Sequence, residues 1–278
     1  MRSLFIATLA AAIVGLWPVT SISMAEETSP KKIVLIGQGP DHPYRTHCYL
    51  PNCELLASCL RQTSGIEAIV SRGWPEDEKI LNGVDAIVLH VRQGGNIFFH
   101  PLNRKRALEL LEEGVGLVAI HWGTGADIGQ VGDLWKKSLG GHFNAQHFSK
   151  YAVETSTVRQ ANRSHPVSRG WNDFQLLDEF YFKLQFEESA IPISKATVQG
   201  EEYPVSWAFE RKMGGRSFAF VCGHFHDNFG LKPFRQMIVN GILWTAQVDI
   251  PEQGAPAQIA PHDLDLSPEF EKVKEPNP

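Results

Sequence analysis

The sequence has few cysteines, no excess of positive charge and no long apolar run after its N-terminus. Its four cysteines, Cys48, Cys53, Cys59 and Cys222, fit neither a paired C-x-x-C zinc site nor a redox C-x-x-C motif. The 278 residues carry 26 Lys and Arg against 31 Asp and Glu, which gives a net charge of −5. A mildly acidic chain without a basic stripe argues against nucleic acid as the main partner and leaves neutral polar ligands open.

The motifs of several common enzyme classes are incomplete. Gly37-Gln-Gly39 follows the first apolar segment, but no third glycine opens a helix, so a dinucleotide site is not indicated. No P-loop is present. The turn at residues 120–125 lacks the Ser or Cys that such a strand-to-helix turn carries in many α/β hydrolases, which argues against acyl transfer there. Cys222 ends an apolar run and is typical of a buried, inert thiol.

The N-terminus has the plan of a secretory signal peptide. Arg2 precedes an apolar run over residues 4–17, and a small-x-small sequence occupies residues 23–25. We therefore expect a signal peptide over residues 1–25 and an exported protein, periplasmic or extracellular. An uncleaved N-terminal anchor is the alternative, although the run is short for a membrane span. No stable membrane insertion is expected after cleavage. Export to an oxidising compartment permits a disulfide bond, so the first two cysteines are either bonded to each other or free.

The rest of the chain predicts one α/β domain over residues 31–248. Short Val- and Ile-rich runs alternate with helical patterns, which indicates right-handed βαβ crossovers and a doubly wound, mainly parallel sheet. The predicted strands lie near 32–37, 66–71, 84–91, 115–121 and 216–222, and the predicted helices near 51–64, 102–113 and 232–247.

The region between about residues 150 and 210 has a different pattern, with three strand-like stretches and little helix between them. It predicts an inserted β region at the edge of the main sheet. Residues 251–278, which are rich in proline and charge, predict an extended C-terminal tail.

Histidines recur at or just after the carboxyl ends of the predicted strands. Six of the eleven follow predicted strands: His42, His47, His90, His121, His224 and His226. Ligands of open α/β sheets bind outside the carboxyl ends of the strands, and imidazole both titrates near neutrality and binds metals. The pattern therefore predicts a polar catalytic or metal-binding cleft.

A carboxylate pair adds a candidate base. Along the stretch 178–181, strand alternation points Glu179 and Tyr181 one way and Asp178 the other. Glu179 is thus a candidate general base or metal ligand, with a solvated carboxylate on an edge strand as the alternative.

The run Gly223-His-Phe-His226 also suggests a set of metal-binding side chains. Residues two apart in an extended segment project together, so His224 and His226, with His121 and a carboxylate, would form three or four ligands. A divalent ion, with zinc as the first guess, is the only cofactor that the sequence suggests.

Together these stretches resemble the trehalose-utilisation (ThuA-like) family over about residues 31–248. The matching stretches lie at 114–121, 139–147, 165–166, 178–181, 204–207, 215–216, 223–224 and 241–246. The resemblance implies a fold like that of class I glutamine amidotransferases without their glutaminase chemistry. It also implies a role in carbohydrate metabolism and a small carbohydrate ligand.

Carried over position by position, the resemblance implies a polar cleft. The expected catalytic residues are His121, His147, Glu179 and His224. The expected substrate contacts are His42, His47, Asp178, Tyr181, Trp207, Arg216 and His226.

Two hypotheses follow. One is an enzyme that cleaves a sugar or keto-sugar by His/Glu acid–base catalysis, with or without a metal. The other is a non-catalytic carbohydrate-binding or accessory protein, in which tryptophans at positions 122, 171 and 207 either stack on sugar rings or pack in the core.

Overall fold

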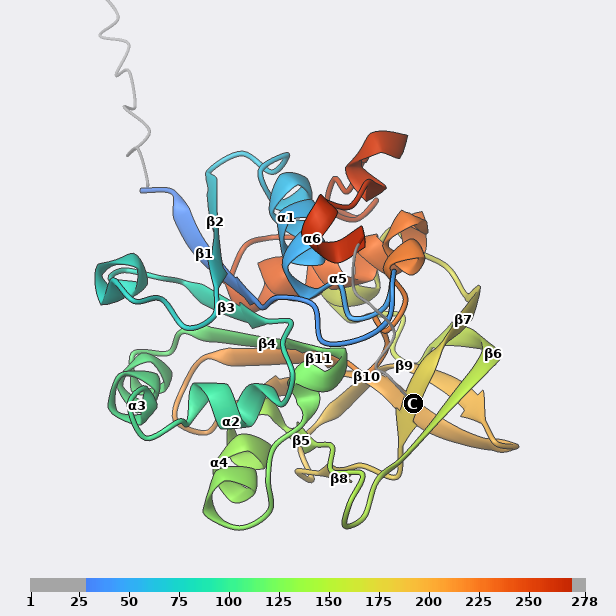
Figure 1. Cartoon of the computed structure of the whole chain (residues 1–278), viewed down its shortest axis with the longest axis horizontal. Helices are drawn as coiled ribbons and strands as arrows, with labels where there is room; N and C mark the ends of the chain where they lie inside the picture. Colours follow the sequence, from blue (N-terminus) through green and yellow to red (C-terminus); the bar gives the residue numbers. More distant parts are fainter. Residues whose placement is uncertain (1–28, 272–278) are drawn as a thin grey trace, which may run out of the picture.

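A mixed sheet of nine strands runs through the structure, a computed structural model that describes residues 29–271 (Figure 1). Its strands are β1 (Lys31–Gly37), β2 (Ile66–Arg72), β3 (Ala86–Leu89), β4 (Gly116–Ile120), β6 (Lys150–Gln160), β7 (Phe174–Phe182), β9 (Ile191–Val198), β10 (Glu201–Glu210) and β11 (Arg216–Phe220). A separate antiparallel pair consists of β5 (Gly141–His142) and β8 (Gln185–Phe186). The predicted signal peptide lies outside the described residues.

The strand order is β2-β1-β3-β4-β11-β10-β9-β6-β7. The first five strands are parallel and follow the 2-1-3-4-5 order of flavodoxin-like doubly wound sheets. Every residue of β3 and β4 is buried, as expected for strands that are covered on both faces. The predicted doubly wound α/β fold is confirmed.

Helices cover both faces of the parallel half (Figure 1). The α-helices are α1 (Tyr49–Leu60), α2 (Gly94–Phe98), α3 (Arg104–Glu112), α4 (Gln130–Leu139), α5 (Lys232–Thr245) and α6 (Pro268–Glu271). Short 3₁₀ helices are η1 (Glu78–Leu81), η2 (His121–Thr124), η3 (Pro166–Ser168), η4 (His226–Gly230) and η5 (Pro261–Leu264). Sequence periodicity did not reveal α2 or α4, because α2 has five residues and the buried face of α4 includes Gly132 and Ser138.

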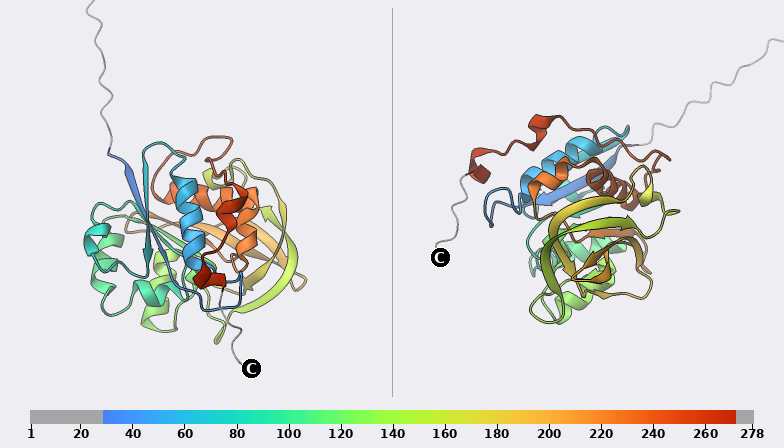
Figure 2. Two further views of the ribbon diagram at one scale, coloured as in Figure 1. Left: turned by 45° about the horizontal axis from the view of Figure 1, so that its top comes forward. Right: turned by 90° about the vertical axis from the view of Figure 1, so that its right-hand side faces the viewer.

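The β-rich region continues the main sheet as its antiparallel half. β10 pairs antiparallel with β11, and β9, β6 and β7 follow in the same sheet. β6 and β7 pair along most of their length, from Lys150–Phe182 to Val158–Phe174. The predicted edge insertion is therefore continuous with the main sheet, and its twist places β7 across from the carboxyl ends of the parallel strands (Figures 1 and 2).

The C-terminal segment is largely irregular, but it packs on the domain. Ala257 is buried, and its carbonyl accepts hydrogen bonds from Arg235 of α5. Farther along, Leu266 and Phe270 form a small apolar cluster with Cys48, next to α1. Residues 251–271 thus lie against the domain instead of extending from it (Figure 2). No helix within residues 29–271 combines the length and apolar character needed to cross a membrane.

Candidate functional site

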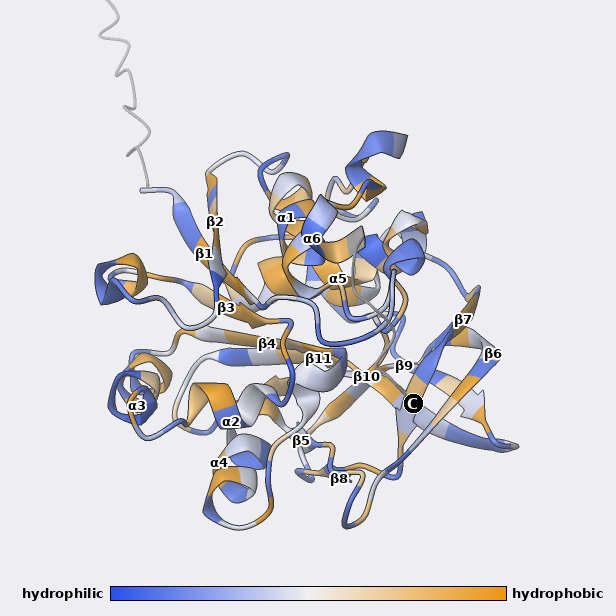
Figure 3. Cartoon of the chain, in the orientation of Figure 1, coloured by the Kyte–Doolittle hydropathy of each residue, from blue (hydrophilic) through white to orange (hydrophobic). Residues whose placement is uncertain are grey.

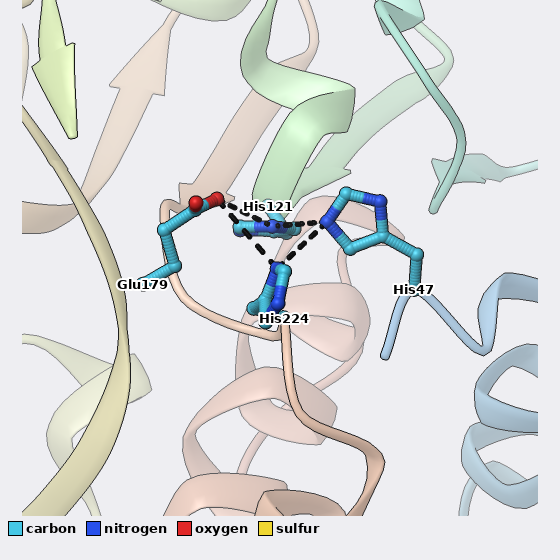
Figure 4. A group of neighbouring side chains, drawn as sticks. All are labelled: His47, His121, Glu179 and His224. Carbon is cyan, nitrogen blue, oxygen red and sulfur yellow. Dashed lines mark hydrogen bonds and ion pairs between the residues drawn. The ribbon is translucent and has the colours of Figure 1, made fainter. Parts of the chain in front are cut away.

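Four side chains converge at the carboxyl ends of β4 and β11: His47, His121, Glu179 and His224 (Figure 4). His47 Nε2 lies 3.0 Å from His121 Nε2 and 2.8 Å from His224 Nδ1. Glu179 Oε2 lies 3.5 Å from His121 Nε2 and 3.6 Å from His224 Nδ1. The predicted convergence of His121, Glu179 and His224 is therefore found, and His47 joins them.

His121 occupies the turn directly after β4. Its φ of +53° lies in the left-handed region, which non-glycine residues adopt rarely and mostly where the surrounding structure enforces it. Two residues later, a Cβ on Gly123 would lie 2.4 Å from the carbonyl oxygen of Leu89, so only glycine fits this turn without displacing β3. The fully buried imidazole faces the Val221 carbonyl through Nδ1, at 2.8 Å. A histidine thus occupies the turn that carries the nucleophile in many α/β hydrolases.

His47 comes from the loop between β1 and α1. Its backbone N–H donates to the carbonyl of His224 at 2.9 Å, and it too has a positive φ, of +47°. The Nδ1 atom lies 2.8 Å from the Tyr49 hydroxyl and 3.4 Å from a carboxylate oxygen of Asp41. These contacts fix the ring so that Nε2 points into the cluster, and sequence reasoning had placed His47 only among the substrate contacts.

Asp178 holds the His224 segment in place. Its buried carboxylate accepts hydrogen bonds from the backbone N–H groups of Gly223 and His224, both at 3.0 Å, and from that of Glu179 at 2.7 Å. The Asn228 side chain donates a further bond at 2.8 Å. Burial raises the pKa of Asp178 to about 7, although these donors favour the ionised form. Asp178 therefore fixes the backbone that carries His224 and Glu179, and it is buried away from the cavity. This corrects its expected place among the substrate contacts.

The protonation pattern of the cluster concentrates lone pairs at one point. Burial lowers the pKa of His121 well below its ordinary value and that of His224 to about 3, so both rings are uncharged at neutral pH. The Val221 carbonyl requires a proton on Nδ1 of His121, and the Asp41 carboxylate favours one on Nδ1 of His47. His121 then presents an unprotonated Nε2, and His47 does so in the tautomer that Asp41 favours. Two such nitrogens 3.0 Å apart, next to a carboxylate, repel each other unless a cation or proton lies between them.

A cavity of about 280 Å³ opens in front of the cluster. The residues that line it are His42, His47, Gln93, Trp122, Phe143, Asn144, Ala145, Gln146, Tyr151, Glu179 and Tyr181. Tyr181 stacks on Phe143 with ring centroids 3.7 Å apart and brings its hydroxyl within 3.1 Å of His121 Nε2. Strand alternation thus correctly placed Glu179 and Tyr181 on one side. The volume is close to the lower limit of roughly 300 Å³ for small-molecule sites.

His147 does not join the site. The Asn144 side chain accepts hydrogen bonds from the backbone N–H groups of Gln146 and His147, and the resulting turn leaves His147 exposed. Its expected catalytic role is therefore wrong. Asn144 and Gln146, from the same stretch, line the cavity instead, and sequence reasoning passed over them because it followed the histidines.

His226 is also separate from the cluster, which corrects its assignment as a metal ligand and substrate contact. Residue 226 begins the 3₁₀ helix η4, so the extended geometry that would point it alongside His224 ends there. Its buried ring contacts the Asn52 side chain and the Leu264 carbonyl, the latter at 3.1 Å. His226 thus links α1 to the C-terminal segment.

Two further expected substrate contacts lie elsewhere. Trp207 is fully buried in β10, where its indole N–H donates to the Leu139 carbonyl at 2.8 Å. Arg216 begins β11, and because β11 runs parallel to β4, this is the opposite end of the sheet from the cluster. Its guanidinium lies over the ring of Trp244, 5.0 Å from the centroid. Trp207 is a core residue and Arg216 a distant surface residue.

All four cysteines are buried and unpaired in the structure. Burial raises the pKa of the Cys222 thiol well above its usual value, so this thiol is not the reactive thiolate that nucleophilic catalysis needs.

The site belongs to an α/β protein whose histidine and carboxylate cluster lies at the carboxyl edge of a doubly wound sheet. The chain is a member of the ThuA family, described as trehalose utilisation, whose model matches residues 35–245. That description associates the chain with carbohydrate metabolism. No curated protein matches the chain.

Solved structures share the fold at low sequence identity. A ThuA-like protein from Bacteroides uniformis ATCC 8492 aligns with a TM-score of 0.60 and 17% identity, over 84% of this chain and 97% of that one. The cytoplasmic protein STM3548 from Salmonella typhimurium aligns with a TM-score of 0.54 and 18% identity, over 77% of this chain and 98% of its own. The cytoplasmic protein STM1381 from Salmonella typhimurium LT2 has the same TM-score, with 17% identity over 77% and 99% of the two chains.

Beneath the cluster, His90 makes folding stability depend on pH. The ring is fully buried at the end of β3, 3.0 Å from the Asn52 amide, and burial lowers its pKa to about 3. The unfolded chain takes up this proton near the ordinary value of about 6.5, so unfolding becomes easier as pH falls from about 6.5 towards 3. The His90 contribution reaches about 1.4 kcal/mol per pH unit. Denaturant titrations of wild type and His90→Gln across this range should show a shallower slope in the variant; equal slopes would contradict the account.

Proposed function

We propose that this protein is a metal-dependent enzyme that cleaves a bond in a sugar or keto-sugar by acid–base catalysis. The observation that carries the proposal is the cluster of three histidines and one glutamate, of which His47 and Glu179 line a cavity with polar and aromatic walls. The ligand is expected to be a small neutral carbohydrate, in agreement with the family description.

The cluster fits a divalent ion of the zinc type. Zinc–ligand bonds of about 2.0–2.1 Å in tetrahedral geometry place neighbouring ligand atoms roughly 3.3 Å apart. Four of the six distances between the ligand atoms range from 2.8 to 3.6 Å, and all six lie within 4.8 Å. Zinc is commonly bound by imidazole and carboxylate, and its histidines usually donate their second ring nitrogen to a carbonyl or carboxylate. His121 and His47 have such partners in the Val221 carbonyl and Asp41.

Three histidines suffice as protein ligands of a catalytic zinc, which leaves the carboxylate available for chemistry. When bound, the ion would polarise an oxygen of the substrate. Glu179 faces the cavity with 15% of its side chain exposed. Burial raises its pKa, so it accepts and returns a proton more readily near neutral pH than an ordinary glutamate. We assign Glu179 as the general base.

Tyr181 supplies a hydrogen-bond donor. Burial raises the pKa of its hydroxyl well above the ordinary value, so the group stays protonated. It is positioned to donate to a substrate oxygen next to the cluster. The ring of Trp122 and the amides of Gln93 and Asn144 are available for the apolar face and the hydroxyls of a sugar.

A screen of metal-loaded protein with monosaccharides, disaccharides and their keto derivatives tests the proposal. We expect turnover of at least one compound, loss of turnover after exhaustive chelation and its return on adding zinc. Turnover that persists unchanged after chelation would remove the metal from the account. Binding without turnover of any compound would instead identify a carbohydrate-binding protein.

We also propose that the enzyme works outside the cytoplasm, on the basis of the N-terminal segment. Intact-mass analysis of the exported protein should place the new N-terminus near Glu26. A mass that retains Met1 would contradict processing at this site.

A further inference from the structure

The outward face of β6 and β7 carries an apolar strip next to the cavity. Tyr151 is 59% exposed, Val153 54% and Leu177 52%. Tyr151 pairs with Tyr181 across the two strands, and Val153 pairs with Glu179. Directly paired residues project to the same face of a sheet. The face that presents Glu179 and Tyr181 to the cavity therefore continues beyond it as this strip, which consists of residues 151, 153 and 177.

The strip is a local feature of one face. On the other face of β7, Leu176, Asp178 and Phe180 are buried in the interior. Figure 3 shows both apolar and polar stretches along the two strands. Glu179 is the only charged residue on the outward face between Tyr151–Tyr181 and Thr155–Leu177, so a neutral occupant suits it. Clustered exposed apolar side chains of this kind mark binding surfaces.

Tyr151 connects the strip to the cavity. It is one of the cavity-lining residues, yet more than half of its surface is open to solvent. A cavity of about 280 Å³ accommodates one sugar ring more readily than two. A second ring attached to the first lies on the strip if it leaves the cavity on the side of Tyr151.

We propose that this strip is a subsite for a second, neutral ring of the substrate, with Tyr151 as its stacking platform. The inference rests on the proposed function. The occupant is defined by a flat apolar ring face, which either the second pyranose of a disaccharide or an aromatic aglycone provides. Aromatic rings of tyrosine bind such faces through their own apolar surface, while the hydroxyl stays in water.

Calorimetric titration of the zinc-loaded protein with glucose, trehalose and phenyl glucoside tests the subsite. We expect the two-ring compounds to bind more tightly than glucose. Tyr151→Ala should weaken the two-ring compounds by about three- to tenfold, which corresponds to one stacking contact, and weaken glucose by less. Tyr151→Phe should retain wild-type affinity, because it keeps the ring. Met213→Ala, at an exposed position in the turn before β11, is the control and should change nothing.

The outcomes separate the two proposals. Equal weakening of all three compounds in Tyr151→Ala, or no advantage of the two-ring compounds in wild type, would overturn the subsite while leaving the proposed function intact. Binding of none of the three compounds to wild type would count against the proposed function and the subsite together. Loss of a wild-type dimer in Tyr151→Ala, with ligand affinities unchanged, would show that the strip is a contact between copies of this chain. The tighter of the two-ring compounds identifies the source of the second ring.

Discussion

His224→Ala should yield a folded protein that has lost at least 100-fold in zinc affinity and, with it, its activity. Outer-shell partners of a metal site typically contribute about 10–100-fold to affinity, and a residue in direct contact with the ion contributes more. His224 has ordinary backbone geometry, unlike His47 and His121, so alanine introduces no backbone strain there. Zinc titration with a competing chelator measures the change, and circular dichroism checks the fold.

His226→Ala is the matched control, two residues along the same segment. Its ring lies outside the cluster and contacts Asn52 and Leu264, so this variant should lose stability and keep its zinc. The opposite pattern, with zinc lost from His226→Ala and retained in His224→Ala, would restore the ligand set that the sequence suggested and contradict the structure.

Glu179→Gln should lower the rate by about a hundredfold or more, because the amide cannot accept the proton that a general base removes. The substitution is nearly isosteric and the side chain lies at the cavity wall, so folding and zinc binding by the three histidines should be retained. The pH–rate profile of wild type should show a limb for a basic group that must be unprotonated, and the variant should lack this limb.

Cys222→Ala is the companion variant. The thiol is fully buried and its pKa is raised, so we expect a stability loss of about 1 kcal/mol or less and an unchanged rate. An inactive Cys222→Ala protein beside a fully active Glu179→Gln protein would replace the acid–base mechanism with a thiol mechanism.

The parallel half of the fold was predictable from the sequence because its inner strands β1, β3, β4 and β11 are largely buried on both faces. Their Val- and Ile-rich runs end in histidine or glycine, and the ends of parallel strands meet at one edge. This reasoning placed His121 and His224 together, and their ring centroids are 5.5 Å apart. Strand alternation also correctly separated Asp178 from Glu179.

The errors have local structural causes. His226 was paired with His224 on the assumption of extended backbone, but η4 begins at that residue. His147 was favoured for its side chain, whereas the Asn144 turn that orients the loop depends on side chain-to-backbone hydrogen bonds that periodicity does not reveal. The role of His47 depends on its left-handed backbone, for which the only sequence signal is a loop rich in histidine and proline.

Trp207 and Arg216 illustrate a second limit. Both match the family pattern, but a matching stretch can serve the core or the far edge of the sheet as well as the site. Trp207 packs against Phe186 with ring centroids 5.1 Å apart, and Arg216 stands at the amino end of its strand. Because β11 pairs parallel with β4, the first residue of β11 lies at the end of the sheet opposite the cluster. The strand pairing, and not the motif, therefore determines the location of Arg216.

The most direct test of the central claim is the metal content of the purified, zinc-equilibrated protein, measured by elemental mass spectrometry and combined with X-ray absorption at the zinc edge. The account predicts one zinc per chain, with a first shell of imidazole nitrogens and oxygen at about 2.0–2.1 Å. A protein that retains no zinc after equilibration, or a zinc shell that contains sulfur at about 2.3 Å, would contradict a metal centre built from His47, His121 and His224.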